Sequence, residues 1–315
     1  MELRSLGKYT LVEPLEVESR SCRFYLVRDE DEPDGGPPPY LAKLLDLRRG
    51  PDAPRARGQF EHEIRLLKSV NHASVPTLHA AGEQDGIPYI VMDHVVGVDL
   101  ATLLGFRGPE ARGRALPKEL AVYVMGQLAD ALRHMHTLEY MEQGEPTPLG
   151  VVHRDLAPHN VMVSKNGDVV LCDFGSAYSE WLPPEHDEPL AGDLAYMAPE
   201  RLAEGGRCSV ATDLFALAVM LWEMLRGERC LARSTDAQTR DEIMRFDIAQ
   251  SGRRVTGLSS KLSEIVRRNL DRDPNRRYPD AYKMLQRLAQ TPEAQFAERA
   301  RAQLGQLVAQ TDPGV

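Results

Sequence analysis

The sequence predicts an α+β protein in which a β-rich first part is followed by a larger, mainly helical second part. In the first part, short β-prone runs alternate with spacers rich in turn residues. In the second part, apolar residues recur at helical spacing. The β-prone runs are 23–27, 40–45 and 89–92, and the clearest helical stretches are 120–138 and 214–225. A chain of 315 residues is long enough for one large domain or two lobes around a cleft.

One helix interrupts the strands of the first part. Apolar residues recur at helical spacing between Phe60 and Val70, and Glu63 lies next to Ile64 on this helix, near its buried side. A buried carboxylate is costly unless it is paired, and Lys43 on the run 40–45 is the obvious cation. Taken alone, each residue has a simpler interpretation, as an exposed strand lysine and a solvated helix glutamate.

The most informative stretch of the second part is the segment 153–160, His-Arg-Asp-Leu-Ala-Pro-His-Asn. Two β-prone runs follow it, joined by Asn166-Gly167, which is a strong hairpin signal. A hairpin brings its open ends together, so Asn160 and Asp173 become neighbours, with Asp155 upstream in the same loop. Hard divalent cations such as Mg²⁺ need oxygen ligands of this kind. The alternative interpretation is a polar loop beside a surface hairpin.

Composition excludes several classes of function. The formal net charge of −9 argues against general affinity for nucleic acid, which needs a basic surface. The longest apolar run, 214–222, is too short to span a bilayer, and the N-terminus lacks a signal-peptide core. The four cysteines have no metal-ligand or redox spacing, which suits a reducing compartment. We therefore expect a cytoplasmic protein that binds neither nucleic acid nor a membrane.

The order Asp155, Asn160, hairpin and Asp173-Phe174-Gly175 resembles the catalytic and metal-binding segments of protein kinases. Three later features resemble the same family: the segment 195–200, Ala-Tyr-Met-Ala-Pro-Glu; Asp213 at the start of an apolar helix; and Arg277, which matches a buried arginine that pairs with Glu200. These features disfavour a small-molecule phosphotransferase of the same ancestral fold. The resemblance covers roughly residues 8 to 289 and is nearest to bacterial Hanks-type Ser/Thr kinases.

The resemblance implies a bilobal fold with three parts. Residues 1–94 would form the small lobe, with a five-stranded sheet and one helix, and residues 95–290 the larger helical lobe. Residues 291–315 would form a helical tail with an apolar stripe that includes Leu304 and Val308. Packing of this tail on the larger lobe is the favoured interpretation, and a regulatory partner or dimer contact through the 291–310 helix is the alternative.

The resemblance also implies an activity and a set of site residues. The protein would bind ATP with Mg²⁺, or with Mn²⁺, and transfer the γ-phosphate to the hydroxyl of a protein substrate. Asp155 would orient that hydroxyl and accept its proton, while Lys43, braced by Glu63, would contact the phosphates. Asn160 and Asp173 would hold the metal. The nucleotide-binding positions would be Leu15, Phe24, Leu41, Lys43, Met92, Asp93, Val95, Asp99, Met162 and Asp173. Asp99 has a simpler alternative role as the cap of the helix that follows it.

Several positions depart from the family pattern. The segment 15–25 should hold a glycine-rich loop and holds no glycine, so side chains crowd the backbone approach to phosphates. Phe24 and Leu41 replace smaller residues above the base, and Ala157 and Asp193 replace two catalytic helpers. These departures predict atypical or weak nucleotide binding. They also leave a second interpretation open, a pseudokinase that serves as a protein-interaction or regulatory module.

Overall fold

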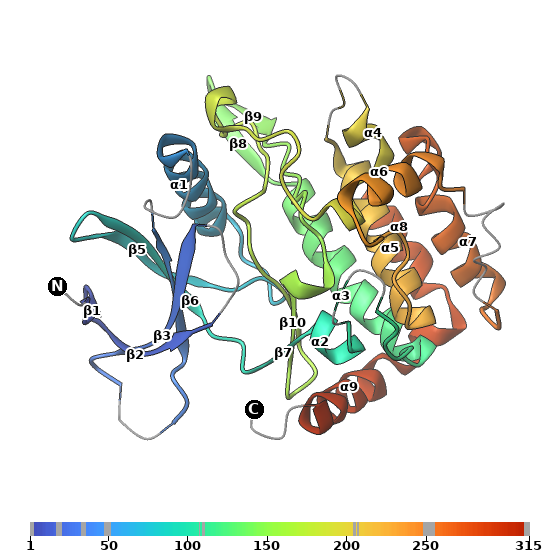
Figure 1. Ribbon diagram of the computed structural model, residues 1–315, viewed down its shortest axis with the longest axis horizontal. Coiled ribbons are helices and arrows are strands. Elements are labelled where there is room, and N and C mark those ends of the chain that lie inside the picture. Colours follow the sequence, from blue (N-terminus) through green and yellow to red (C-terminus); the bar gives the residue numbers. More distant parts are fainter. Residues whose placement is uncertain are drawn as a thin grey trace. The chain divides into compact units, whose positions relative to one another are not determined.

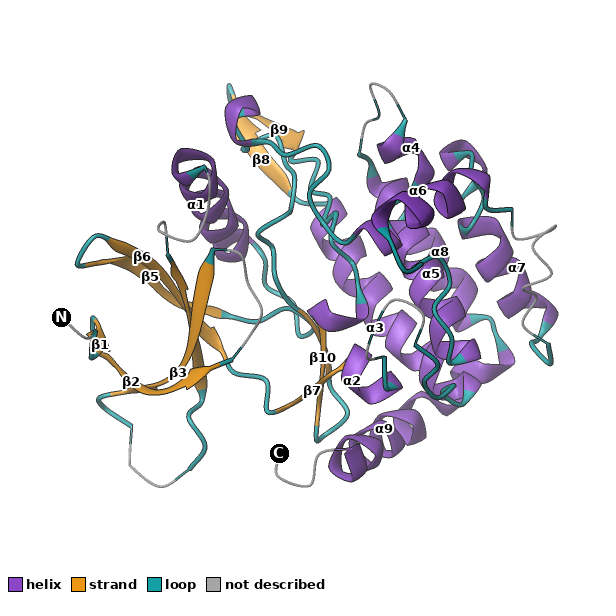
Figure 2. Ribbon diagram, in the orientation of Figure 1, coloured by secondary structure: helices purple, strands orange, loops and turns teal. Residues whose placement is uncertain are grey.

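The computed structural model describes residues 3–16, 21–32, 36–46, 52–106, 108, 111–203, 206, 208–247 and 256–311. The chain forms two compact units, Met1–Val95 with Trp181–Asp187, and Val96–Glu180 with Glu188–Val315. The first unit is built mainly on a β-sheet, and the second is mainly helical (Figure 2). This arrangement confirms the α+β class that the sequence predicts.

The first unit contains an antiparallel sheet of six strands in the order β1-β2-β3-β4-β6-β5. The resemblance implies five strands, and the additional one is the two-residue strand β1. The bounds are Ser5–Leu6 for β1, Tyr9–Leu15 for β2, Cys22–Asp29 for β3, Tyr40–Leu45 for β4, Leu78–Gln84 for β5 and Ile87–Asp93 for β6. The helix α1, Ala53–Ser69, follows β4 (Figure 1).

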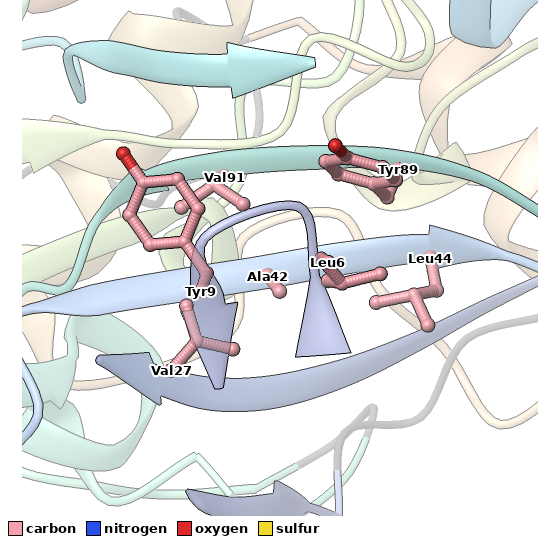
Figure 3. Packing of buried hydrophobic residues seen from close by; sticks show 7 residues of the cluster. All are labelled: Leu6, Tyr9, Val27, Ala42, Leu44, Tyr89 and Val91. Carbon is pink, nitrogen blue, oxygen red and sulfur yellow. The ribbon is translucent and has the colours of Figure 1, made fainter. Parts of the chain in front are cut away.

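The strand register separates the two faces of this sheet. Directly paired residues in a sheet share a face, and alternate residues along a strand share it as well. Phe24 pairs with both Leu15 and Lys43, and Leu41 pairs with Met92. All five side chains therefore lie on one face. The opposite face carries the apolar cluster in Figure 3, which consists of Leu6, Tyr9, Val27, Ala42, Leu44, Tyr89 and Val91.

The segment Trp181–Asp187 belongs to the first unit because it packs on α1. The guanidinium of Arg65 lies 4.6 Å from the centre of the Trp181 ring. The His186 ring packs against α1 at Gly58. A larger residue would not fit there, since a Cβ at position 58 would lie only 2.2 Å from the ring. The short helix η2, Pro184–His186, is therefore seated directly on α1.

The second unit is organised around the buried helix α5, Val210–Arg226, which has apolar side chains on all sides. A three-stranded sheet in the order β11-β10-β7 holds the predicted hairpin. The strands are β7 Gly97–Asp99, β8 Glu139–Glu142, β9 Glu145–Pro148, β10 Val161–Ser164 and β11 Val169–Leu171. The helices are α2 Leu100–Leu104, α3 Lys118–His136, η1 Pro158–Asn160, η3 Leu194–Tyr196, α4 Pro199–Leu202, α5, α6 Asp236–Arg245, α7 Ser260–Asn269, η4 Pro274–Arg276, α8 Ala281–Ala289, η5 Pro292–Phe296 and α9 Ala297–Thr311.

The tail helix α9 packs on the second unit, beside β10 and α2 (Figure 1). Its residues Ala300, Leu304 and Val308 are fully buried, whereas Phe296, at the end of η5, is 48% exposed. The favoured expectation for the tail therefore agrees with the structure. Among the described residues, no helix combines the length and the apolar character needed to cross a bilayer.

Candidate active site

Lys43 and Glu63 form a buried ion pair within the first unit. Lys43 projects from β4 and Glu63 from α1, and the ammonium donates hydrogen bonds of 2.8 and 2.9 Å to the two carboxylate oxygens. Their exposed fractions are only 5% and 2%. Burial of either charge alone would be costly, so the pair fixes α1 to the sheet and the lysine to one geometry.

The predicted nucleotide positions of the first unit lie around this pair. Leu15, Phe24 and Leu41 are half-buried, and together with the buried Met92 they give the Lys43 face of the sheet an apolar surface. Such a surface suits the flat ring of a base.

Asp93, at the end of β6, turns its carboxylate away toward β5. It accepts hydrogen bonds from Thr77 N (2.9 Å) and pairs with the His79 ring (2.6 Å). Burial alone would raise the pKa of Asp93, but the His79 and Thr77 contacts outweigh it and hold the pKa below its usual value. Val95 is half-buried at the end of this unit.

In the second unit, Asp213 fixes the backbone of the loop that carries Asp155. Its carboxylate accepts hydrogen bonds from His153 N (2.9 Å) and Arg154 N (3.0 Å), and from His136 Nε2 (2.9 Å). Burial alone would raise the pKa of Asp213, but the contacts with His136 and His153 outweigh it and lower the pKa. The loop turns at Arg154, which has a left-handed φ of 66°.

Asp155 is held by the backbone of the segment that precedes η3. The N–H of Asp193 donates to Asp155 Oδ1 at 2.7 Å, whereas the Asp193 carboxylate accepts from Ala195 N at 2.9 Å and so caps η3. Position 193, which departs from the family pattern, therefore contributes a backbone donor to Asp155. Gly192 permits this approach: its φ is 105°, and a Cβ there would lie 2.5 Å from Arg154 O.

The hairpin brings Asn160 and Asp173 to its open end. Val161 pairs with Leu171, and Cys172 N donates to Asn160 O at 2.8 Å. The Asn160 amide donates to Asp155 O at 2.9 Å, which joins the asparagine to the Asp155 loop. Asp173 has a left-handed φ of 60°, and its carboxylate accepts from Gly175 N at 3.1 Å. The expected gathering of all three residues is therefore present.

This donor set fits a hard divalent cation that takes its remaining ligands from elsewhere. The described residues contain no group of three or more His, Cys, Asp or Glu side chains arranged around a metal. Asn160 and Asp173 together offer an amide oxygen and a carboxylate, the partial set typical of Mg²⁺ bound with substrate phosphates. A metal here would therefore depend on the substrate for the rest of its shell.

The rings of His153 and Phe174 connect the loop of Asp155 with Asp173-Phe174-Gly175. They meet edge to face with their centres 5.0 Å apart, and both residues are buried. Burial lowers the pKa of His153, against the opposing influence of Asp213, Asp155 and Asp173.

Asp99 and Met162 face each other across β7 and β10. Asp99 is the N-cap of α2, since its two oxygens accept from Thr102 N (2.8 Å) and Thr102 Oγ1 (2.7 Å). The capping role that the sequence offers as the simpler interpretation is thus present. A contact of Asp99 with a ribose stays a prediction.

Arg277 anchors the segment that ends at Glu200. Its guanidinium makes a two-pronged ion pair with the Glu200 carboxylate, with both distances 2.7 Å. It also donates to Ala211 O (2.8 Å) and Asp271 O (2.9 Å), and its side chain is fully buried. Planar pairs of this kind are among the strongest charge-assisted hydrogen bonds.

Sequence reasoning missed a second buried cluster next to this segment. Tyr196 donates to Glu223 Oε2 at 2.6 Å, and Glu223 Oε1 accepts from Cys230 N at 2.8 Å. Arg229 lies against the rings of Tyr196 and Phe106, 5.2 Å from each centre. Only the position of Glu223 inside an apolar helix gave a signal, because a carboxylate there requires a partner.

Comparison with known proteins agrees with this geometry. The protein kinase domain model matches residues 42–288. The chain is 27% identical over 227 residues to the serine/threonine-protein kinase PrkC of Bacillus subtilis, covering 72% of this chain and 32% of that protein. It is 30% identical over 223 residues to the tyrosine-protein kinase MasK of Myxococcus xanthus, covering 70% and 34%. It is 27% identical over 232 residues to the serine/threonine-protein kinase PknB of Mycobacterium leprae, covering 72% and 34%.

The match covers most of the chain, so this chain belongs to the protein kinase domain family, as the motifs predict. The chain spans about a third of the length of the curated relatives it matches. The matched range begins within β4, so the segment 15–25 and the tail helix α9 lie outside it.

Proposed function

We propose that this protein is a Ser/Thr protein kinase that transfers the γ-phosphate of Mg-ATP to a protein hydroxyl. The observation that carries the proposal is the gathering of Asp155, Asn160 and Asp173 at the open end of one hairpin. We assign residues 1–94 to the nucleotide-binding lobe, 95–290 to the catalytic lobe and 291–315 to the tail.

The residues divide the chemistry between them. Asp155, with one oxygen held by the Asp193 N–H, orients the substrate hydroxyl and accepts its proton as the new O–P bond forms. Asn160 and Asp173 hold Mg²⁺, or Mn²⁺, which neutralises phosphate charge when bound. Lys43, fixed by Glu63, binds phosphate oxygens on the nucleotide.

Nucleotide binding is expected to be weak. The segment 15–25 has no glycine to let backbone N–H groups approach phosphates, and its residues 17–20 lie outside the described part of the chain. Phe24 and Leu41 add volume to the face where adenine would rest. The remaining adenine contacts would come from Leu15, Met92, Met162 and the backbone at 93–95.

The second candidate is a pseudokinase that works as an interaction or regulatory module. The glycine-free segment and Ala157 favour it. A partner or dimer contact through 291–310 would use the exposed side of α9, since Ala300, Leu304 and Val308 are buried in this chain. The intact Lys43–Glu63 pair favours the kinase, because drift after loss of activity would leave a buried ion pair unprotected by selection.

A nucleotide-binding experiment distinguishes the two candidates. Thermal stability is measured with ATP and Mg²⁺, and phosphate incorporation into a general protein substrate is followed, for the wild type, Lys43→Met and Lys68→Met. Lys68 is an exposed lysine on α1 and serves as the matched control. We expect a stability increase and phosphate incorporation in the wild type and the control, and loss of both in Lys43→Met. A wild type that neither binds the nucleotide nor incorporates phosphate would support the pseudokinase.

A further inference from the structure

The second unit contains a pocket of about 310 Å³ that the proposed chemistry does not use. Arg112, Arg229 and Arg233 line it, with Glu228 as its one acidic residue and Trp222 in its wall. Three cations in one pocket stand out in a protein whose formal net charge is −9. The pocket is therefore suited to an anion rather than to a cation or an apolar group.

Arg229 has an ion pair but no hydrogen bond within the described part of the chain. Its side chain is only 13% exposed and forms an ion pair with Glu223, with 3.6 Å between Nε and Oε1. Both oxygens of Glu223 are already hydrogen-bonded, to Tyr196 and to Cys230 N. Among the described residues Arg229 has no hydrogen-bond acceptor, and its Nε is buried without one. An anion in the pocket would supply acceptors that a guanidinium so enclosed otherwise lacks.

The other charged residues that line the pocket differ in whether they already have a partner. Arg112 is exposed and has neither an ion pair nor a hydrogen bond from its side chain within the described part of the chain. Arg233 already has a partner, because its guanidinium forms an ion pair with Glu242 at 2.9 Å. Glu228 is engaged by Arg226 at 3.2 Å, outside the set of pocket arginines. Arg112 and Arg229 thus both line the cavity with donors that form no hydrogen bond among the described residues.

Short contacts connect this pocket with Asp155. Arg229 lies against the Tyr196 ring, and Tyr196 ends the helix η3. The same helix is capped by Asp193, whose N–H holds Asp155. A ligand bound by Arg229 would therefore lie beside the segment that holds Asp155.

We propose that this pocket binds an acidic side chain, Asp or Glu, of the protein substrate. The proposal rests on the proposed function and adds to it the class of substrate. Arg229 would make a charge-assisted contact with the carboxylate from the enclosed end of the pocket, and Arg112 would close over it from the exposed end.

The first test compares peptides that differ only in charge. A Ser/Thr peptide library with Asp, Ala or Lys at each flanking position is phosphorylated by the wild type, Arg112→Glu and Arg299→Glu. Arg299 is exposed on α9, outside the pocket lining, and its variant makes the same change in net charge. We expect kcat/KM to be about tenfold higher for Asp than for Ala at one position in the wild type and in Arg299→Glu. In Arg112→Glu this preference should be lost or turn toward Lys. No acidic preference, or one that Arg112→Glu leaves unchanged, would overturn the proposal.

The second test does not depend on phosphate transfer. The chain has two tryptophans, so Trp181→Phe leaves Trp222 in the pocket wall as the fluorescent reporter. We expect the acidic peptide to change Trp222 emission at concentrations where the Ala peptide and inorganic phosphate do not, and Arg112→Glu to abolish the change. A response to inorganic phosphate alone would contradict a peptide site. Binding of the acidic peptide without any phosphate transfer would support the pocket and refute the kinase activity. Transfer without charge preference would refute the pocket alone.

Discussion

Arg277 shows how much of this structure depends on single buried charges. Its side chain is fully buried, while the neighbouring Arg276 is 74% exposed and lies 3.7 Å from Asp273. Removing one partner of a buried pair leaves the other charge without compensation, whereas an exposed arginine contributes little. We expect Arg277→Ala to lower the free energy of unfolding by about 3–5 kcal/mol. Arg276→Ala, the matched control, should change it by less than about 0.5 kcal/mol in the same chemical denaturation experiment. Equal effects of the two variants would contradict this account of Glu200 and Arg277.

His153 should make stability depend on pH. Burial lowers the pKa of His153 in the folded protein below the value of about 6.5 that it has in the unfolded chain. As the pH falls below 6.5, the unfolded chain therefore binds a proton that the folded protein does not, and the free energy of unfolding decreases. Groups that face it include Asp213, Asp155 and Asp173. We expect the free energy of unfolding of the wild type to fall below pH 6.5 by up to about 1.4 kcal/mol per pH unit more than that of His153→Phe. Denaturant titrations between pH 7.5 and 5.5 measure this difference. His159→Gln, which changes an exposed ring, should follow the wild type, and parallel pH profiles for wild type and His153→Phe would refute the expectation.

At the scale of residues, the sequence predicted features that depend on the type of side chain and missed those that depend on the backbone. The hairpin turn and the oxygen-bearing residues at its ends were enough to expect Asn160 and Asp173 as neighbours, because a hairpin of known register fixes its ends. The hydrogen bond from Asp193 to Asp155 was not predictable in the same way. It uses a backbone N–H, and any residue type supplies one. The type of side chain at position 193 therefore gave no indication of this bond.

At the scale of elements, α9 supports the hairpin that joins Asn160 and Asp173. Gly305 lets α9 approach closely, since a Cβ there would lie 2.5 Å from Lys165 O. Arg301 of α9 pairs with Asp168 at 2.5 Å, and Tyr123 of α3 donates to Gly167 O at 3.2 Å. The tip of the hairpin is thus held by two helices, one of which lies outside the matched kinase domain.

Gly305→Val should separate α9 from the hairpin. The added side chain would meet backbone atoms, and overpacking of this kind costs about 1–3 kcal/mol in the free energy of unfolding. Gly126→Ala in α3 is the control, because a Cβ there meets nothing within 4 Å and alanine favours the helix. Hydrogen exchange should show faster exchange of the amides of 161–171 in Gly305→Val only. Unchanged exchange of those amides would contradict the support role of α9.

The strands that were not recognised in the sequence were missed for one physical reason. β2 begins with the β-prone residues Tyr-Thr-Leu-Val, but Glu13 and Pro14 interrupt them. β5 reads Leu-His-Ala-Ala-Gly-Glu-Gln and contains no β-branched residue and no Phe, Tyr or Trp. Both form because neighbouring strands supply hydrogen bonds and the sheet supplies packing. The hairpin of β8 and β9 was missed for a similar reason, since its strands read Glu-Tyr-Met-Glu and Glu-Pro-Thr-Pro. By contrast, the long periodic stretches at α3 and α5 were predicted within a few residues of their bounds.

At the scale of the whole molecule, the chain has the buried charged side chains that anchor its loops, but it lacks the glycines that would let backbone N–H groups approach nucleotide phosphates. The Lys43–Glu63 pair and the Asp213 anchor are buried and hydrogen-bonded, and Glu200, which is partly exposed, pairs with the buried Arg277. The segment 15–25 has no glycine. This combination predicts a kinase limited by its affinity for ATP rather than by the geometry of its catalytic loop. The substrate-binding pocket proposed above would then add selectivity for acidic proteins.

The most direct test of this account is the single-turnover rate of phosphate transfer at saturating Mg-ATP. The wild type is compared with Asp155→Asn and with Asp193→Asn, which keeps both the backbone N–H to Asp155 and a side-chain acceptor for the cap of η3. We predict that the wild type transfers phosphate to Ser or Thr, that Asp155→Asn is slower by about a hundredfold or more, and that Asp193→Asn stays within about threefold of the wild type. Absence of transfer by the wild type, or a rate that survives the loss of the Asp155 carboxylate, would contradict the account.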